Sequence, residues 1–371
     1  MNAIMKPVMS PQNDPWDPIH SLARHGKHVL TSVEMTVTNL CNMRCEHCAV
    51  GDALVMKEEE KLPLPLILQR LEEVEHLQTI SITGGEPTFH ERSVNEYVLP
   101  LLKYAKDRGL FTQINSNVTL DLSRYERLAP FLDVLHISFN YADAEDFLQI
   151  GFAHTGREVK KATAVKLYEQ MISNTIALSK GGVFVSAESM INYRTHKKMP
   201  QIHQMIVEMG CRRHEVHPMY PSSFAANLPA LSLDETRTAI HDLLDHRKPD
   251  VWMLFGTLPF YSCSPSDEDQ RLIRRLREAP MVTVRNDPDG RNRLNVNLFT
   301  GEVFVTDFSS LASLGTIQQD RLDDVFARWL DHPLNLMVNC YCPEARCCGP
   351  NLLVADAYYK GVNFKQRKAI L

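Results

Sequence analysis

Short runs of apolar, often β-branched residues alternate along the chain with longer stretches in which apolar residues recur three and four positions apart. The short runs predict buried strands, at residues 33–37, 80–83, 111–114, 134–138, 183–187 and 215–219. The longer stretches predict helices, at residues 64–77, 94–108, 122–132, 163–180 and 197–209. Because strands separated by helices pair in parallel through right-handed crossovers, the pattern predicts an α/β sheet or barrel. Active-site residues are then expected on the loops at the carboxyl ends of the strands.

The regular alternation of expected strands and helices ends after residue 231. A capping box formed by Ser232 and Glu235 opens a helix expected over residues 232–246. The segments that follow are an apolar run, a charged helix, a turn and two short strands that predict a hairpin, at 251–255, 267–277, 286–290, 294–298 and 303–305. The acidic residues of the turn do not continue into a calcium-loop ligand series, so a plain turn is expected. The chain is therefore expected to have three parts: an N-terminal extension (1–31), an α/β barrel domain (32–230) and a C-terminal extension (231–371).

Composition and charge narrow the class of protein. The 371 residues carry a formal net charge of -5, without the basic footprint typical of nucleic-acid binding. No run approaches the roughly 20 apolar residues of a membrane-spanning helix, and residues 1–30 mix Pro, Asp and His where a signal peptide would be apolar. We expect a cytoplasmic protein that binds neither nucleic acid nor a membrane.

The nine cysteines are grouped rather than scattered. Three lie at 41–48 and four at 340–348, whereas Cys211 and Cys263 stand alone. In a large chain expected to be cytosolic, such groups indicate metal binding or redox chemistry more often than disulfides.

The first group, Cys41, Cys45 and Cys48, follows the first expected strand with the spacing CxxxCxxC. Three thiolates hold three irons of a cubane cluster and leave the fourth iron open for another ligand. A structural zinc site is the alternative, but it normally takes four protein ligands and would need His47 or a distant residue.

The second expected strand ends in Gly84-Gly85-Glu86-Pro87. Glycines lack Cβ, so a ligand can approach the backbone closely, and Glu86 supplies a carboxylate for an ammonium group. By itself such a segment is also compatible with a structural turn.

The two motifs together resemble the radical S-adenosylmethionine (SAM) superfamily. The resemblance implies a partial (β/α)6 barrel and a [4Fe-4S] cluster on Cys41, Cys45 and Cys48. SAM would chelate the open iron, with Gly84, Gly85 and Glu86 at its amino group. It further implies reductive cleavage of SAM to a 5′-deoxyadenosyl radical that abstracts hydrogen from a substrate. The electron would come from a low-potential donor such as flavodoxin or ferredoxin.

Two further segments look like looser superfamily patterns. Residues 114–117 look like the "TNG" segment of the third strand, with Val118 in place of the glycine. Residues 136–140 look like the "S-x-D" segment of the fourth, with Asn140 in place of the acid. Asn117 and Ser138 are therefore candidates to bind the ribose or methionyl group of SAM, with strand-end capping as the alternative.

The second group has the spacing CxCxxxxC with an adjacent extra thiol, in Cys340, Cys342, Cys347 and Cys348. Iron-sulfur, zinc and a redox dithiol are all compatible with such thiols. With the preceding hairpin it resembles the SPASM or twitch extension, which implies a second, auxiliary iron-sulfur cluster. That extension places a cysteine where this chain has Thr306-Asp307, so Cys263 or Cys348, and less favourably Asp307, would complete the ligand set. For Cys263 a buried inert thiol is the alternative.

Taken over nearly its whole length, the chain resembles the radical SAM/CxCxxxxC-motif proteins called YfkAB. This resemblance does not identify the substrate, which we expect to be a small molecule or a peptide. A non-catalytic zinc-stabilised or electron-transfer iron-sulfur module is the competing hypothesis. Glu188 on the fifth expected strand and Glu215 and His217 on the sixth are candidate catalytic residues, against the alternative that they are ordinary paired polar groups.

Overall fold

The computed structural model describes residues 6–156, 158–308 and 310–370. Residues 1–5, 157, 309 and 371, which the expected extensions and barrel include, lie outside the described residues. The described strands form one sheet in the order β11-β10-β9-β1-β2-β3-β4-β5-β6-β7-β8. None of the described helices has the length and apolar character needed to cross a membrane.

The six predicted parallel strands are confirmed, with ends shifted by a few residues. They are β1 (Ser32–Thr38), β2 (Thr79–Gly84), β3 (Phe111–Ser116), β4 (Val134–Ser138), β5 (Val185–Ile191) and β6 (Arg213–Pro218). Each pairs in parallel with the next strand. The sheet continues in parallel beyond residue 230 through β7 (Trp252–Gly256) and β8 (Val282–Arg285). The apolar run at 251–255 is thus a strand, buried because it lies between two others.

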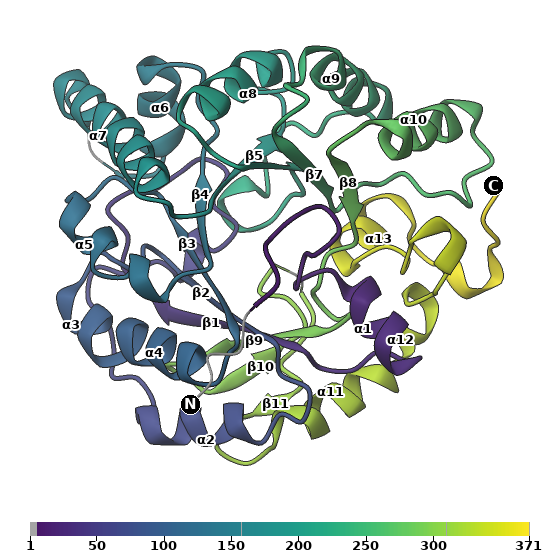
Figure 1. Cartoon of the computed structure of the whole chain (residues 1–371), viewed down its shortest axis with the longest axis horizontal. Helices are drawn as coiled ribbons and strands as arrows, with labels where there is room; N and C mark the ends of the chain where they lie inside the picture. Colours follow the sequence, from purple (N-terminus) through teal and green to yellow (C-terminus); the bar gives the residue numbers. More distant parts are fainter. Residues whose placement is uncertain (1–5, 157, 309, 371) are drawn as a thin grey trace.

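The connections are helical, as the periodicity indicates. The helices along the barrel are α2 (Leu64–Glu72), α3 (Glu91–Ser93), α4 (Leu99–Asp107), α5 (Leu122–Glu126), α6 (Ala144–Gly151), α7 (Lys161–Lys180), α8 (Met199–Glu208), α9 (Leu233–His246) and α10 (Asp267–Glu278). A π-helical turn, Val94–Val98, leads into α4. Pro130 ends the helical pattern of 122–132 early, so that a short 3₁₀ turn replaces its second half. Figure 1 shows these helices arranged around the outside of the strands.

The predicted hairpin is also confirmed, and it extends the sheet on the other side of β1. Strand β9 (Arg293–Asn297) pairs in parallel with β1 and antiparallel with β10 (Glu302–Phe304), which pairs with β11 (Gly315–Thr316). The chain ends in α11 (Leu322–Leu330), α12 (Pro333–Val338) and α13 (Leu352–Tyr358), close to α1 (Pro18–His25) in Figure 1.

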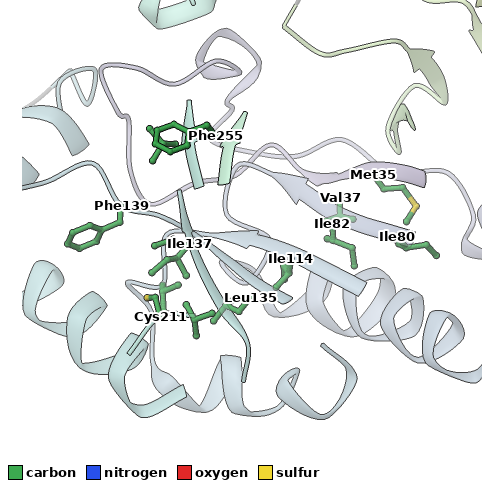
Figure 2. Packing of buried hydrophobic residues seen from close by; sticks show 14 of the residues in the cluster. Met35, Val37, Ile80, Ile82, Ile114, Leu135, Ile137, Phe139, Cys211 and Phe255 are labelled. Atoms are coloured by element: carbon green, nitrogen blue, oxygen red, sulfur yellow. The ribbon is translucent and has the colours of Figure 1, made fainter. Parts of the chain in front are cut away.

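Alternation along each strand separates an apolar face from a polar one. Residues such as Ile114, Leu135 and Ile137 are buried between the strands and the helices in Figure 2. Their neighbours in sequence, Asn115 and His136, line a cavity on the opposite face. Because residues from β1 and from β3 to β8 line that same cavity, the sheet curves around it as an open barrel.

The N-terminal segment closes the end of the barrel at which the strands begin. The side chain of Trp16 is 1% exposed and its indole N–H donates to Ser81 Oγ at 3.0 Å. Asp14 accepts a hydrogen bond of 2.8 Å from Arg285. The purple segment that crosses the space between the strands in Figure 1 is this part of the chain. Trp16 anchors it.

Candidate active site and metal centres

The loop that carries the first three cysteines follows β1 and is held by the side chain of Arg44 and by backbone hydrogen bonds to α6. Arg44 donates from Nη1 to the carbonyl oxygens of Cys41 and Met43, both at 2.9 Å. The backbone N–H of Arg44 donates to Gly151 O at 3.0 Å, and that of Glu46 to Ile150 O at 2.8 Å. The Cys41 to Cys48 loop is therefore fixed between the ends of β1 and α6.

Gly84 and Gly85 pack directly against this loop. Their backbone hydrogen bonds run from Gly85 N to Thr38 O and from Glu86 N to Leu40 O, both at 2.7 Å. A Cβ on Gly85 would lie 2.7 Å from the carbonyl carbon of Leu40. Gly84 has φ of +142°, a conformation that favours glycine. In this structure the space left by the missing Cβ atoms of the two glycines is therefore occupied by residues 38–41, which lead into the Cys41–Cys48 loop, called the cluster loop below.

Glu86 joins the ends of β2 and β3. Its carboxylate is fully buried and accepts hydrogen bonds from Ser116 Oγ at 3.0 Å, Asn117 N at 2.7 Å and Thr88 N at 3.1 Å. Burial raises the pKa of Glu86, and the hydrogen bonds from Thr88 and Asn117 oppose that rise. Contact between Glu86 and the amino group of SAM stays a prediction.

Asn117 lies beside the cluster loop. Its amide nitrogen donates to Asn42 Oδ1 at 2.9 Å and lies 3.9 Å from Cys41 Sγ. The next residue, Val118, has φ of 54°. That left-handed conformation explains why a glycine suits this position, since a β-branched side chain is strained there.

Ser138 is partly exposed at the end of β4, opposite Glu188 in the register of β4 and β5. Asn140, in the position of the expected acid, is 1% exposed and accepts a hydrogen bond of 2.7 Å from Met190 N. Asn140 therefore ties β4 to β5, whereas the role of Ser138 in binding SAM stays a prediction.

The three candidate catalytic residues line one barrel cavity of about 180 Å³. Glu188 Oε2 lies 2.8 Å from His136 Nε2, and Glu215 Oε1 lies 3.0 Å from His217 Nε2. The second ring nitrogen of His217 is 2.9 Å from Thr257 Oγ1. The structure thus brings the three residues together on the inward face of β5 and β6.

Charged neighbours set the protonation of this group. Burial alone would raise the pKa of Glu215, but Arg285 and Arg213 hold it well below its ordinary value. Burial likewise opposes the charged form of His217, yet its hydrogen bond to Glu215 and the charge of Glu188 raise its pKa. The cavity therefore contains ionised carboxylates next to a histidine that favours its protonated form.

The second cysteine group meets Cys263 in space. Cys263, from the loop after β7, lines one small cavity together with Cys340, Cys342 and Cys347. Cys342 and Cys347 pair across a short bridge, with Cys342 N donating to Cys347 O at 2.8 Å and Cys347 N to Cys342 O at 3.1 Å.

Two other candidate ligands lie elsewhere. Cys348 is 1% exposed and packs against Ile19 and Leu22 of α1. Asp307 accepts a hydrogen bond of 3.4 Å from Thr36 on β1. Of the candidates to complete the second site, Cys263 is the one that shares the cavity of the other thiols.

Comparisons with known proteins give the family. A model of the radical SAM superfamily matches residues 35–193, and a model described as a YfkB-like domain matches residues 219–369. A Bacillus subtilis protein named "Putative protein YfkA" is 53% identical over 369 residues, which is 99% of either chain. The chain belongs to the radical SAM superfamily, in the family of YfkA. That membership implies SAM and a [4Fe-4S] cluster as cofactors.

Solved radical SAM structures share the fold at low sequence identity. Streptococcus suis SuiB bound to S-adenosylmethionine aligns with a TM-score of 0.60 and 15% identity, over 90% of this chain and 76% of that one. The protein anSMEcpe with bound AdoMet aligns with a TM-score of 0.57 and 15% identity, over 80% of either chain. A Saccharolobus islandicus protein named "Probable GTP 3′,8-cyclase" is 22% identical over 197 residues, 52% of this chain and 58% of that one.

The donors on the first loop fit the cluster of a radical SAM protein. Burial raises the pKa of the Cys41 thiol to about 12 and raises those of Cys45 and Cys48, so a bound cation is needed to keep them as thiolates. Met43 N donates to Cys41 Sγ at 3.4 Å, as amides do around cluster sulfurs. Within the described part of the chain, no three potential ligands already stand in the geometry of a metal site. The fit therefore rests on the donor types and their shared loop.

Sequence reasoning missed four members of the charge network around the cavity: His136, Arg213, Arg285 and Asp14. His136 lies two residues before Ser138, so strand alternation places both on the inward face and would have identified it. Asp14 and Arg285 are separated by 271 positions in the sequence, so no local sequence pattern predicts their contact.

Proposed function

We propose that this chain is a radical SAM enzyme that cleaves SAM reductively at a [4Fe-4S] cluster and abstracts hydrogen from a substrate held in the barrel cavity. Cys41, Cys45 and Cys48 would hold the cluster, and the bound cofactors supply a 5′-deoxyadenosyl radical. The observation that carries the proposal is the packing of the cysteine loop against Gly84 and Gly85, with His47 of the same loop lining the barrel cavity, in a chain of this superfamily.

The chain's own residues have three tasks in this proposal. Asn117, beside Cys41, and Ser138, at the end of β4, would orient SAM through hydrogen bonds to its ribose or methionyl group. The N-terminal segment excludes water from the far end of the barrel, because Trp16 fills it. Orientation and exclusion of water are what a radical reaction requires of a protein.

The polar groups of the cavity would handle protons. The hydrogen bond and charge of His136 outweigh the effect of burial and lower the pKa of Glu188, which is therefore ionised. It can therefore accept a proton from a substrate, and His217, which favours its protonated form, can donate one. The catalytic roles of Glu188, Glu215 and His217 rest on this arrangement.

The size of the cavity favours a small molecule or one side chain of a peptide. About 180 Å³ is less than most pockets for drug-sized ligands provide. Solved relatives of this fold include SuiB bound to precursor peptide SuiA and anSMEcpe with bound AdoMet and a Cp18Cys peptide, which favours a peptide side chain. A flavodoxin or ferredoxin would supply the electron, and the second cysteine group would hold an auxiliary iron-sulfur cluster.

The test is the formation of 5′-deoxyadenosine. Anaerobically reconstituted protein, reduced with dithionite and mixed with SAM, should release 5′-deoxyadenosine and methionine in equal amounts. Cys45→Ala should reduce that release by at least about a hundredfold, because the cluster loses one of its three thiolates. Cys211→Ala removes a thiol buried in the apolar core and should retain activity. Equal activity in parent and Cys45→Ala, or none in either, would remove the enzymatic proposal and leave the non-catalytic module.

A further inference from the structure

Arg291 is a buried cation without a carboxylate partner among the described residues. Its side chain is 1% exposed. It donates from Nη2 to the carbonyl oxygen of Pro350, and its Nε has no hydrogen-bond partner in the described structure. A guanidinium stays charged in proteins, and burying a charge without a counter-charge is among the most unfavourable events in folding.

The other buried arginines among the described residues, Arg213 and Arg285, are paired: both lie against Glu215, at 3.2 Å for the former. The partly buried Arg293 is paired as well, 2.7 Å from Asp289. Arg291 departs from this rule. Arg291 therefore requires a buried anion, and no carboxylate among the described residues supplies it.

The hydrogen bond to Pro350 O holds the guanidinium of Arg291 two residues from Cys348, against the segment that carries the second cysteine group. Cys348, Cys340 and Cys347, together with Tyr261, are the groups whose charges would act on it. Protonated thiols carry no charge and cannot balance a guanidinium. Thiolates bound to a metal centre can, because the metal keeps them deprotonated.

We propose that Cys263, Cys340, Cys342 and Cys347 hold a fully thiolate-ligated iron-sulfur cluster, and that Arg291 is its buried counter-cation. A [4Fe-4S]²⁺ core with four thiolates has a net charge of about −2, so it supplies the missing anion. The inference deepens the auxiliary-cluster part of the proposed function and does not depend on SAM cleavage.

The ligand set follows from the placement of the thiols. Cys342 and Cys347 face one another across their bridge, and Cys340 and Cys263 line the same cavity. Cys348 does not line that cavity, and its side chain packs against Ile19 and Leu22 of α1. Cys348 is therefore a neighbour of Arg291 but not a ligand.

Four protein ligands leave no iron open, in contrast to the first cluster. Neither SAM nor a substrate can then bind to the second cluster, so one-electron exchange with a flavodoxin or ferredoxin is the role left for it. Its position suits that role, because Cys347 lines a groove together with Arg285 and Asp287, and both of these also line the barrel cavity.

The ligand set is tested in a full-length chain that carries Cys41→Ala, Cys45→Ala and Cys48→Ala, so that only the second centre can bind iron. After anaerobic reconstitution, iron, sulfide and zinc are counted and the reduced protein is examined by electron paramagnetic resonance. Cys348→Ala should keep the iron and the spectrum of this parent. Cys263→Ala should lose at least about a quarter of the iron and change the spectrum. The reverse pattern, or zinc without sulfide, would overturn the proposal, whatever the outcome for 5′-deoxyadenosine.

The counter-cation is tested with Arg291→Met and Arg291→Lys in the same background. With the cluster bound, Arg291→Met should shift its midpoint potential to more negative values, because a reduced cluster has more negative charge to balance, and Arg291→Lys should restore most of the shift. After removal of iron by a chelator, Arg291→Met should be more stable than the parent, since the unpaired charge is gone. An unchanged potential, or an iron-free Arg291→Met chain that is less stable than its parent, would refute the role.

Discussion

Gly85→Ala is the substitution that most directly tests how the end of β2 supports the cluster loop. The added Cβ would lie 2.7 Å from the carbonyl carbon of Leu40 and 3.2 Å from Cys41 Cβ. Carbon atoms in ordinary contact stand about 3.5–4.0 Å apart, so the loop must retreat by about 0.8 Å. Two backbone hydrogen bonds of 2.7 Å, to Thr38 O and Leu40 O, oppose that retreat.

Gly85→Ala should change two quantities, the free energy of unfolding and the iron content of the first site. Overpacking of this kind lowers the free energy of unfolding by about 1–3 kcal/mol, and we expect the upper half of that range because the atoms that clash belong to the backbone. The displaced residue is Cys41 itself, so iron retained at the first site should fall at least about twofold. Gly26→Ala is the matched control: Gly26 has φ of +66° and no described atom within 4 Å of an added Cβ. It should lose only about 1 kcal/mol through backbone strain and keep its iron.

Urea unfolding gives the first quantity, and iron counting with 5′-deoxyadenosine release gives the second. A Gly85→Ala chain that matches Gly26→Ala in both stability and iron content would show that β2 does not press on the cluster loop. A chain that loses stability but keeps iron and activity would show that the clash is absorbed away from Cys41.

Three further predictions concern the rest of the barrel. His203 and His214 are buried, and their Nδ1 atoms lie 2.9 Å apart. Burial lowers the pKa of His203 to about 4, so the folded chain binds fewer protons than the unfolded one. The free energy of unfolding should therefore fall by about 1 kcal/mol between pH 7 and pH 5.5. Trp16→Ala should cost about 3–5 kcal/mol in urea unfolding and Trp16→Phe about 1 kcal/mol, since the latter loses chiefly the hydrogen bond to Ser81. Glu188→Gln should release 5′-deoxyadenosine from SAM without substrate at a rate within about threefold of the parent, because Glu188 pairs with His136 in the substrate cavity.

Each of these has an outcome that contradicts it. A stability profile that is flat between pH 5.5 and 7, or that is equally steep when His203 and His214 are both replaced by Leu, would exclude the histidine pair as its cause. Equal stability of Trp16→Ala and the parent would mean that the N-terminal segment does not fill the barrel. Loss of SAM cleavage in Glu188→Gln would move that residue from the substrate to the SAM site.

The six parallel strands were predictable because their signals are local: an apolar run of about five residues is contained in a short segment, and the structure has these strands where the sequence indicates. The spacing of Cys41, Cys45 and Cys48 is equally local, and the structure places the three on one loop after β1, whereas their binding of a cluster stays a prediction. The apolar run of β7 was noted at 251–255 but not assigned to the parallel sheet, and β8 was not recognised. β8 has only four residues and lies at the edge of the sheet, where three of them, Val282, Thr283 and Val284, are not fully buried, so the apolar pattern is weak.

The grouping of Cys263 with Cys340, Cys342 and Cys347 was predictable only in part, for a related reason. The spacing of its three C-terminal cysteines is local, but Cys263 comes from the loop after β7, whose apolar run was noted without a partner strand. Until β7 is paired with β6, nothing in the sequence brings that loop to the C-terminal cysteines. Asp307 remained a candidate for the same reason, and the pairing of β9 with β1 is what places it near Thr36, away from the thiols.

The protonation of the cavity shows why a site of this kind exceeds any local pattern. Asp14 pairs with Arg285, and Arg285 and Arg213 both lie against Glu215. Glu215 in turn raises the pKa of His217 and so favours its charged form. The first member of this series belongs to the N-terminal segment, the second to the end of β8, and the last to β6. Only a sheet that curves until β8 faces the interior, with the start of the chain passing through it, brings the charges into contact. The residue types that could do acid-base chemistry were visible on β5 and β6, but the charges that set their protonation depend on the closure of the fold.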